Sequence, residues 1–156
     1  MEFVGIINYS IIYLIKSGGL PGIPSGDDVV RDLGLLETCL LYTSAEVFYA
    51  PLVEEIKARG LVAMKEKIEH DYNEEEVPED CHTELTEDRL TVVIDKCPAV
   101  SHIKASGDTP CKWFKNTTST VYGKIASLTG YAFSMDYYCE ETGATKYHFY
   151  KRGAKK

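Results

Sequence analysis

The chain has 156 residues, of which 44% are hydrophobic and 26% are charged, and its formal net charge is −7. This length supports one hydrophobic core rather than two ordinary domains, and the composition is typical of a globular protein. Because the chain is acidic and its Lys and Arg residues are scattered, we expect no nucleic-acid partner.

Residues 1–26 are predicted to be an appendage to the main domain, residues 27–156. Residues 3–15 are apolar, but this run is shorter than the ~20 residues needed to cross a bilayer, so we expect no membrane span. A loop rich in Gly and Pro follows over residues 17–26. Because contact with another surface would shield apolar side chains from water, we expect residues 3–15 to dock on their own domain, on a second copy in a homodimer, or on a partner subunit.

The pattern of apolar residues changes its period in the middle of the chain. Before residue 73 the spacing is helical, and we expect helices over residues 27–41, 43–59 and 61–72, with a kink at Pro51. After an acidic loop over residues 73–80 the pattern alternates, as it does in strands. We expect two hairpins with two helices between them, over residues 83–86, 89–96, 98–106, 110–128, 131–139 and 145–151. The predicted fold is therefore α+β, with a helical N-terminal half packed on a mostly antiparallel sheet of about four strands.

The five cysteines are an odd number, and no secretory signal is evident before them, so we expect a cytoplasmic protein with free or metal-bound thiols. Cys97 ends a predicted strand and precedes Pro98, which begins a helix. A thiol at a helix N-terminus faces unpaired N–H groups, which favours the thiolate. With His102 about one turn into that helix, Cys97 and His102 are candidate catalytic residues. The alternative is a packed cysteine and a surface histidine, since no third residue that would orient the pair is evident.

Aromatic residues are concentrated in the last predicted hairpin and in the helix before it. Aromatic rings with polar tips suit a pocket for a flat, partly polar ligand. The candidate ligand-binding residues are Trp113, Tyr122, Phe133 and Tyr137. The alternative is an aromatic core between the helix and the sheet.

The last hairpin also contains a spaced pattern, which consists of Asp136, Cys139, Gly143, Tyr147 and Phe149. This pattern resembles the closing signature of the 4-vinyl reductase (V4R) small-molecule-binding domains, in which an acidic residue, Cys, Gly, Cys and Phe occur at this spacing. The chain is still more similar to the related L-2-amino-thiazoline-4-carboxylic acid hydrolase-like family. That family adds a Cys-Pro at a strand end, here Cys97-Pro98, and a helical N-terminal half. The resemblance covers roughly residues 40–151.

The resemblance implies a zinc ion held by three Cys and one acidic residue. Cys111, Asp136 and Cys139 match three of these positions, and Tyr147 replaces the last Cys, although a neutral Tyr is a poor zinc ligand. His148 is the remaining candidate for a metal ligand, but it points to the opposite side of a regular strand from Tyr147. Asp136 and Cys139 also have opposite parity, so a bulge is needed if both are to bind one ion. The alternative is that Cys111 and Cys139 are small buried hydrophobic residues.

The resemblance predicts a domain that binds a small aromatic or heterocyclic ligand, with no nucleotide cofactor. An alternative is a hydrolase that opens a C–N or C=N bond of a cyclic amidine such as L-2-amino-thiazoline-4-carboxylate. In such an enzyme the nucleophile would be Cys97, or water on a metal near Cys111 and Cys139. A further alternative is an accessory subunit of a larger enzyme. The sequence leaves open whether the protein is catalytic.

Overall fold

The described part of the protein is residues 46–110 and 114–153 of a computed structural model. All of these residues belong to one unit of the chain, Thr38–Lys156. The predicted appendage, its boundary at residue 27, Cys111 and Trp113 lie outside the described residues.

Two helices meet at Gly60. They are α3, Ala50–Arg59, and α4, Leu61–Glu74, and their buried residues recur at helical spacing along one face of each helix. The helix expected over residues 43–59 is interrupted at Tyr49, two residues before Pro51, so Pro51 stands in the first turn of α3 rather than at a kink inside a longer helix. Proline is well tolerated there because a first-turn N–H has no partner within the helix. In the part of the chain that the structure describes, no helix is long and apolar enough to cross a membrane.

The sheet has four antiparallel strands in the order β1-β2-β4-β3. A 3-10 turn, η1, Pro78–Asp80, leads into the first hairpin, which consists of β1, Cys81–Leu85, and β2, Arg89–Ile94. Two helices follow, α5, Pro98–Ala105, and α6, Phe114–Thr129. The second hairpin is β3, Tyr131–Tyr138, and β4, Thr145–Lys151. The predicted α+β class with an antiparallel sheet of four strands is confirmed.

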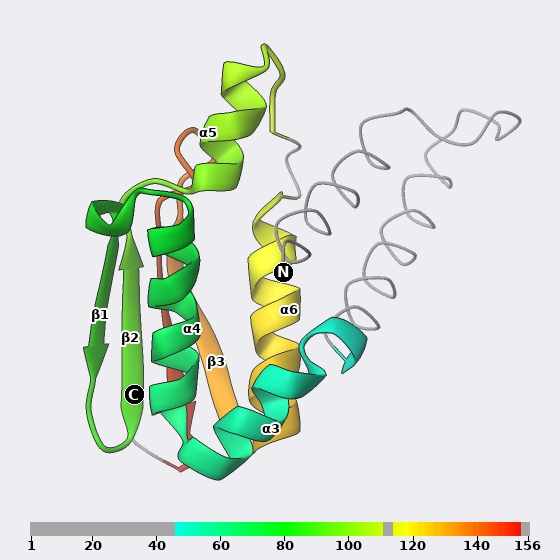
Figure 1. The fold of residues 1–156 in the computed structure, drawn as a ribbon, viewed down its shortest axis with the longest axis vertical. Helices are drawn as coiled ribbons and strands as arrows, with labels where there is room; N and C mark the ends of the chain where they lie inside the picture. Colours follow the sequence, from blue (N-terminus) through cyan, green and yellow to red (C-terminus); the bar gives the residue numbers. More distant parts are fainter. Residues whose placement is uncertain (1–45, 111–113, 154–156) are drawn as a thin grey trace, which may run out of the picture. The chain divides into compact units, whose positions relative to one another are not determined.

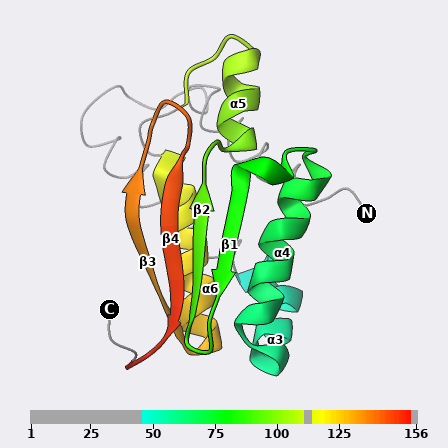
Figure 2. The same ribbon diagram turned by 90° about the vertical axis from the view of Figure 1, so that its left-hand side faces the viewer.

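The sheet has an inner face, covered by helices, and an outer face. On β2 the inner face carries Leu90, Val92 and Ile94, each 2% exposed or less, and these residues pair with alternate residues of β4. α4 contacts β1 and β2, α6 contacts β3, and α3 contacts both helices. Figures 1 and 2 show α4 and α6 on this side, with none of the described helices over the outer face. α5 lies beyond one end of the sheet, near the turn between β3 and β4.

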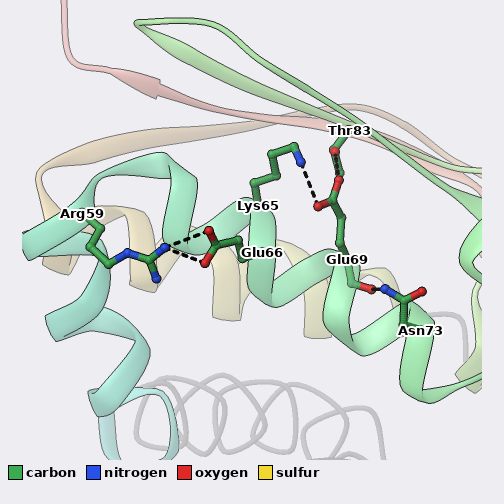
Figure 3. Close-up of polar contacts among 6 residues, drawn as sticks. All are labelled: Arg59, Lys65, Glu66, Glu69, Asn73 and Thr83. Atoms are coloured by element: carbon green, nitrogen blue, oxygen red, sulfur yellow. Dashed lines mark hydrogen bonds and ion pairs between the residues drawn. The ribbon is translucent and has the colours of Figure 1, made fainter.

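Polar contacts hold α4 in place against its neighbours (Figure 3). Arg59 donates to both carboxylate oxygens of Glu66, at 2.8 and 2.7 Å. Glu69 accepts hydrogen bonds from Lys65, at 2.8 Å, and from Thr83 of β1. Burial of the Glu69 carboxylate opposes its ionisation, but these two hydrogen bonds prevail and lower its pKa. α4 is therefore attached to β1 as well as to α3, which fixes the side chains of its last turns over the inner face.

Candidate functional site

An aromatic cluster fills the space between α6 and the C-terminal hairpin. Tyr122 of α6 lies 6.2 Å from Phe133 of β3, 5.3 Å from Tyr147 and 5.6 Å from Phe149 of β4, measured between ring centroids. Tyr147 and Phe149 are 2% and 1% exposed, because both occupy inward positions of β4. Two of the predicted ligand-binding residues, Tyr122 and Phe133, are therefore brought together.

Hydroxyl groups lie within this aromatic interior. The side chains of Tyr122 and Tyr147 are joined by a hydrogen bond. Tyr72, in the last turns of α4, is close enough that Tyr122 contributes to the rise of its pKa. Burial is the main cause that raises the pKa of each of these three phenols. All three phenols are therefore neutral at physiological pH and can donate as well as accept hydrogen bonds.

Two thiols adjoin the same group of phenols. Cys81 begins β1, and burial is the main cause that raises its pKa to about 11. Cys97 precedes α5, and its thiol contributes to the raised pKa of both Tyr72 and Tyr122. Sequence reasoning did not assign Tyr72 or Cys81 to a site. Two patterns in the sequence indicate that these side chains face the interior. Met64, Ile68 and Tyr72 recur every four residues on one helix face, and Cys81 begins an alternating strand.

Cys97 does not have the lowered pKa expected at a helix N-terminus. Burial of the thiol raises its pKa, and the amides of Val100 and Ala99 at the start of α5 only oppose that rise. The Cys97 backbone N–H donates to the carbonyl of Thr142, at 2.9 Å, so the residue is attached to the turn between β3 and β4. The thiol form therefore predominates at neutral pH, because desolvation of the thiolate outweighs the helix amides.

His102 has an acidic partner that was not evident from the sequence. Its Nε2 lies 3.0 Å from Oε2 of Glu75, just after α4, and both side chains are exposed. A carboxylate beside a histidine is the orienting element of many catalytic pairs. In this structure, however, the imidazole is at the surface, whereas Cys97 is half-buried and desolvation raises the pKa of its thiol.

The predicted metal ligands are distributed over two places. Asp136 and His148 lie on the outer face, where Oδ2 of Asp136 is 3.0 Å from Nε2 of His148. Cys139 lies in the turn between β3 and β4, where the Thr142 side chain, followed by the amides of Thr142 and Glu141, lowers its pKa. Among residues 46–110 and 114–153, no three His, Cys, Asp or Glu side chains form a group that could hold a metal ion. Because Cys111 is not among these residues, the zinc site stays a prediction.

In the last hairpin, side chains alternate between the two faces of the sheet as expected, except at one place in β3. Tyr147 and His148 point to opposite faces, as expected for a regular strand, but β3 contains a bulge between Met135 and Tyr137. Tyr137 shares the parity of Phe133 in the sequence, yet the bulge turns it to the outer face, where it is 47% exposed. Tyr137 therefore does not join Tyr122 and Phe133 in the interior.

Comparison of the chain with protein-family models, with curated proteins and with solved structures found no match.

Proposed function

We propose that the protein binds a small, flat ligand with an aromatic or heterocyclic ring between the inner face of its sheet and the helices α4 and α6. The observation that carries this proposal is the group of neutral hydroxyl and thiol side chains beside the aromatic cluster. This group consists of Tyr72, Tyr122, Tyr147, Cys81 and Cys97.

Such an interior is not needed for packing alone. Burial of a hydroxyl gains little even when it is hydrogen-bonded, as those of Tyr122 and Tyr147 are, so aliphatic side chains would fill the same volume at least as well. The rings of Tyr122, Phe133 and Phe149 contact one another in tilted and edge-to-face arrangements, which are also the arrangements that a planar ligand ring would adopt against them. The phenols and thiols offer donors at the ends of those rings. A ligand with a planar ring and one or two acceptor atoms matches both features.

The charge of the group favours a neutral ligand. All five side chains are neutral at physiological pH because burial raises each of their pKa values. A carboxylate brought among them would lose its hydration without gaining a cationic partner from this group. We therefore place a ligand that exposes carbonyl or ring-nitrogen acceptors ahead of an ionised acid such as L-2-amino-thiazoline-4-carboxylate.

The hydrolase alternative is the weaker of the two proposals. A nucleophilic cysteine acts as the thiolate, and the raised pKa of Cys97 keeps its thiol protonated at neutral pH. The exposed pair of His102 and Glu75 supplies a possible base, but on a side chain that stands in solvent. A role as an accessory subunit of a larger enzyme is compatible with ligand binding and remains a further proposal.

Binding can be tested with 7-methoxycoumarin, a fluorescent planar heterocycle that has a carbonyl acceptor and no titratable group. We expect the full-length protein to bind it saturably, and Tyr147→Phe to weaken binding about tenfold, which corresponds to one lost hydrogen bond of about 1.4 kcal/mol. Tyr150→Phe is the matched control, because Tyr150 pairs with Ala132 and Arg89 on the outer face. Absence of saturable binding, or equal effects of the two substitutions, would contradict the proposal.

A further inference from the structure

The bulge in β3 decides which of two neighbouring tyrosines faces the interior. Met135 pairs with Tyr147, but Tyr137 pairs with Lys146 and Tyr138 with Thr145, so Asp136 is the additional residue. In a regular strand Tyr137 would point inward with Phe133 and Met135. The additional residue reverses the parity, and Tyr138 takes the inward place opposite Thr145, which is 4% exposed.

Packing alone discriminates weakly between the two arrangements. If the bulge were lost, Tyr137 would pair with Thr145 and replace Tyr138 in the interior, and the buried volume and ring area would hardly change. A one-residue shift in a strand is normally resisted because it exchanges apolar for polar side chains. That penalty is small here, so a local polar contact can decide whether the bulge forms.

The additional residue has such a contact on the outer face. Asp136 Oδ2 lies 3.0 Å from Nε2 of His148 on β4, and Nδ1 of His148 lies 3.0 Å from Oγ1 of Thr91 on β2. The Nζ atom of Lys146 is 3.9 Å from the same Asp136 oxygen. His148 is only 8% exposed although no described helix covers it, so its ring is held in one orientation. The side chains of Thr91, His148 and Asp136 connect β2, β4 and β3 in one line.

This line contains a hydroxyl, an imidazole and a carboxylate, as a hydrolytic triad does. Thr91 and His148, however, lie on the two central strands of the sheet, whose backbone groups are paired with a neighbouring strand on each side. Free N–H groups that could stabilise an oxyanion are therefore not provided beside the Thr91 hydroxyl. The arrangement suits the positioning of a backbone better than acyl transfer.

We infer that His148 is a positioning residue, which holds Asp136 as the additional residue of the β3 bulge and thereby selects Tyr138 rather than Tyr137 for the interior. This selection requires no ligand. Its functional consequence, that Tyr138 and not Tyr137 belongs to the wall of the ligand site, rests on the proposed function.

The test is nitration of tyrosine by tetranitromethane, with each site quantified by mass spectrometry of peptides from the full-length protein. In the parent protein we expect Tyr137 to react at least tenfold faster than Tyr138. In Asp136→Ala and in His148→Leu we expect this ratio to fall at least threefold, because the bulge is no longer stabilised and part of the population adopts the regular strand. His148→Gln keeps a donor and should restore much of the ratio. Asp88→Asn is the matched control, since it removes a surface ion pair with Lys151, at 2.8 Å, outside the bulge.

An unchanged ratio in both Asp136→Ala and His148→Leu would overturn the inference. So would rapid nitration of Tyr147 in these variants, because that buried residue reacts only when the whole interior opens. Nitration needs no ligand, so its outcome is independent of the proposed function. A shifted nitration pattern with unchanged 7-methoxycoumarin affinity would support the positioning role and count against Tyr138 as part of a ligand site.

Discussion

Replacement of Gly143 by alanine should destabilise the protein strongly, because this residue lies where the turn between β3 and β4 meets α5. Gly143 has a φ of +70°, a conformation that residues with a side chain rarely adopt. A Cβ atom there would overlap the Cβ atom of Cys97 and would lie 2.9 Å from Cγ2 of Val100. The turn is held against Cys97 by the Cys97 N–H bond to Thr142, at 2.9 Å, so it cannot move away without breaking that bond.

The expected cost combines two effects. The left-handed backbone conformation costs about 1–2 kcal/mol for a residue that has a Cβ atom. Overpacking against Cys97 and Val100, which is 1% exposed, adds roughly 1–3 kcal/mol. The free energy of unfolding should therefore fall by about 2–5 kcal/mol, a large part of the 5–15 kcal/mol typical of a domain.

Urea unfolding, followed by far-ultraviolet circular dichroism, measures this loss. Gly130→Ala is the control, because Gly130 has a φ of +84° but a Cβ atom added to it would meet nothing within 4 Å. It should lose only the backbone contribution, about 1–2 kcal/mol. If Gly143→Ala were no less stable than Gly130→Ala, the close contact of the turn with Cys97 and Val100 would be refuted.

Two further predictions concern the cysteines. Cys139 should be alkylated by iodoacetamide below pH 8.5, because its lowered pKa increases the thiolate fraction. Cys81 and Cys97 should react only at higher pH, because burial raises their pKa values. Peptide mapping across a pH series measures the order of reaction, and alkylation of Cys97 before Cys139 would contradict this prediction. The family resemblance further predicts about one zinc ion per chain, which elemental analysis would measure, and loss of that zinc in Cys139→Ala. A metal-free parent protein that is as stable as its zinc-treated form would disprove the zinc site.

The secondary structure could be predicted because its signals are local. The alternation of Leu90, Val92 and Ile94 defines β2, and the glycines at positions 60 and 130 end α3 and follow α6. The inward placement of Tyr122 and Phe133 follows from the same periodicity. These predictions need no knowledge of which segments meet in space.

The chemistry of the site could not be predicted to the same degree, because it depends on distant contacts. Whether helix amides or desolvation dominates at Cys97 is decided by the depth at which α5 and the β3–β4 turn bury it. The bulge at Asp136 is hidden because Tyr137 and Tyr138 are the same residue type, so the alternation looks regular with either one inward. The partnership of Glu75 with His102 joins residues 27 positions apart.

The order of the strands has a consequence for how the chain folds. Each hairpin is local, but the ladder between β2 and β4 joins residues far apart, such as Thr91 and His148, which are separated by 57 positions. Closing so long a loop costs chain entropy before the hydrogen bonds and side-chain contacts of the ladder form, so such pairings slow folding. Until β4 pairs with it, one edge of β2 has unpaired backbone N–H and C=O groups. A chain in which β4 has not yet docked therefore exposes a strand edge that can pair with other molecules.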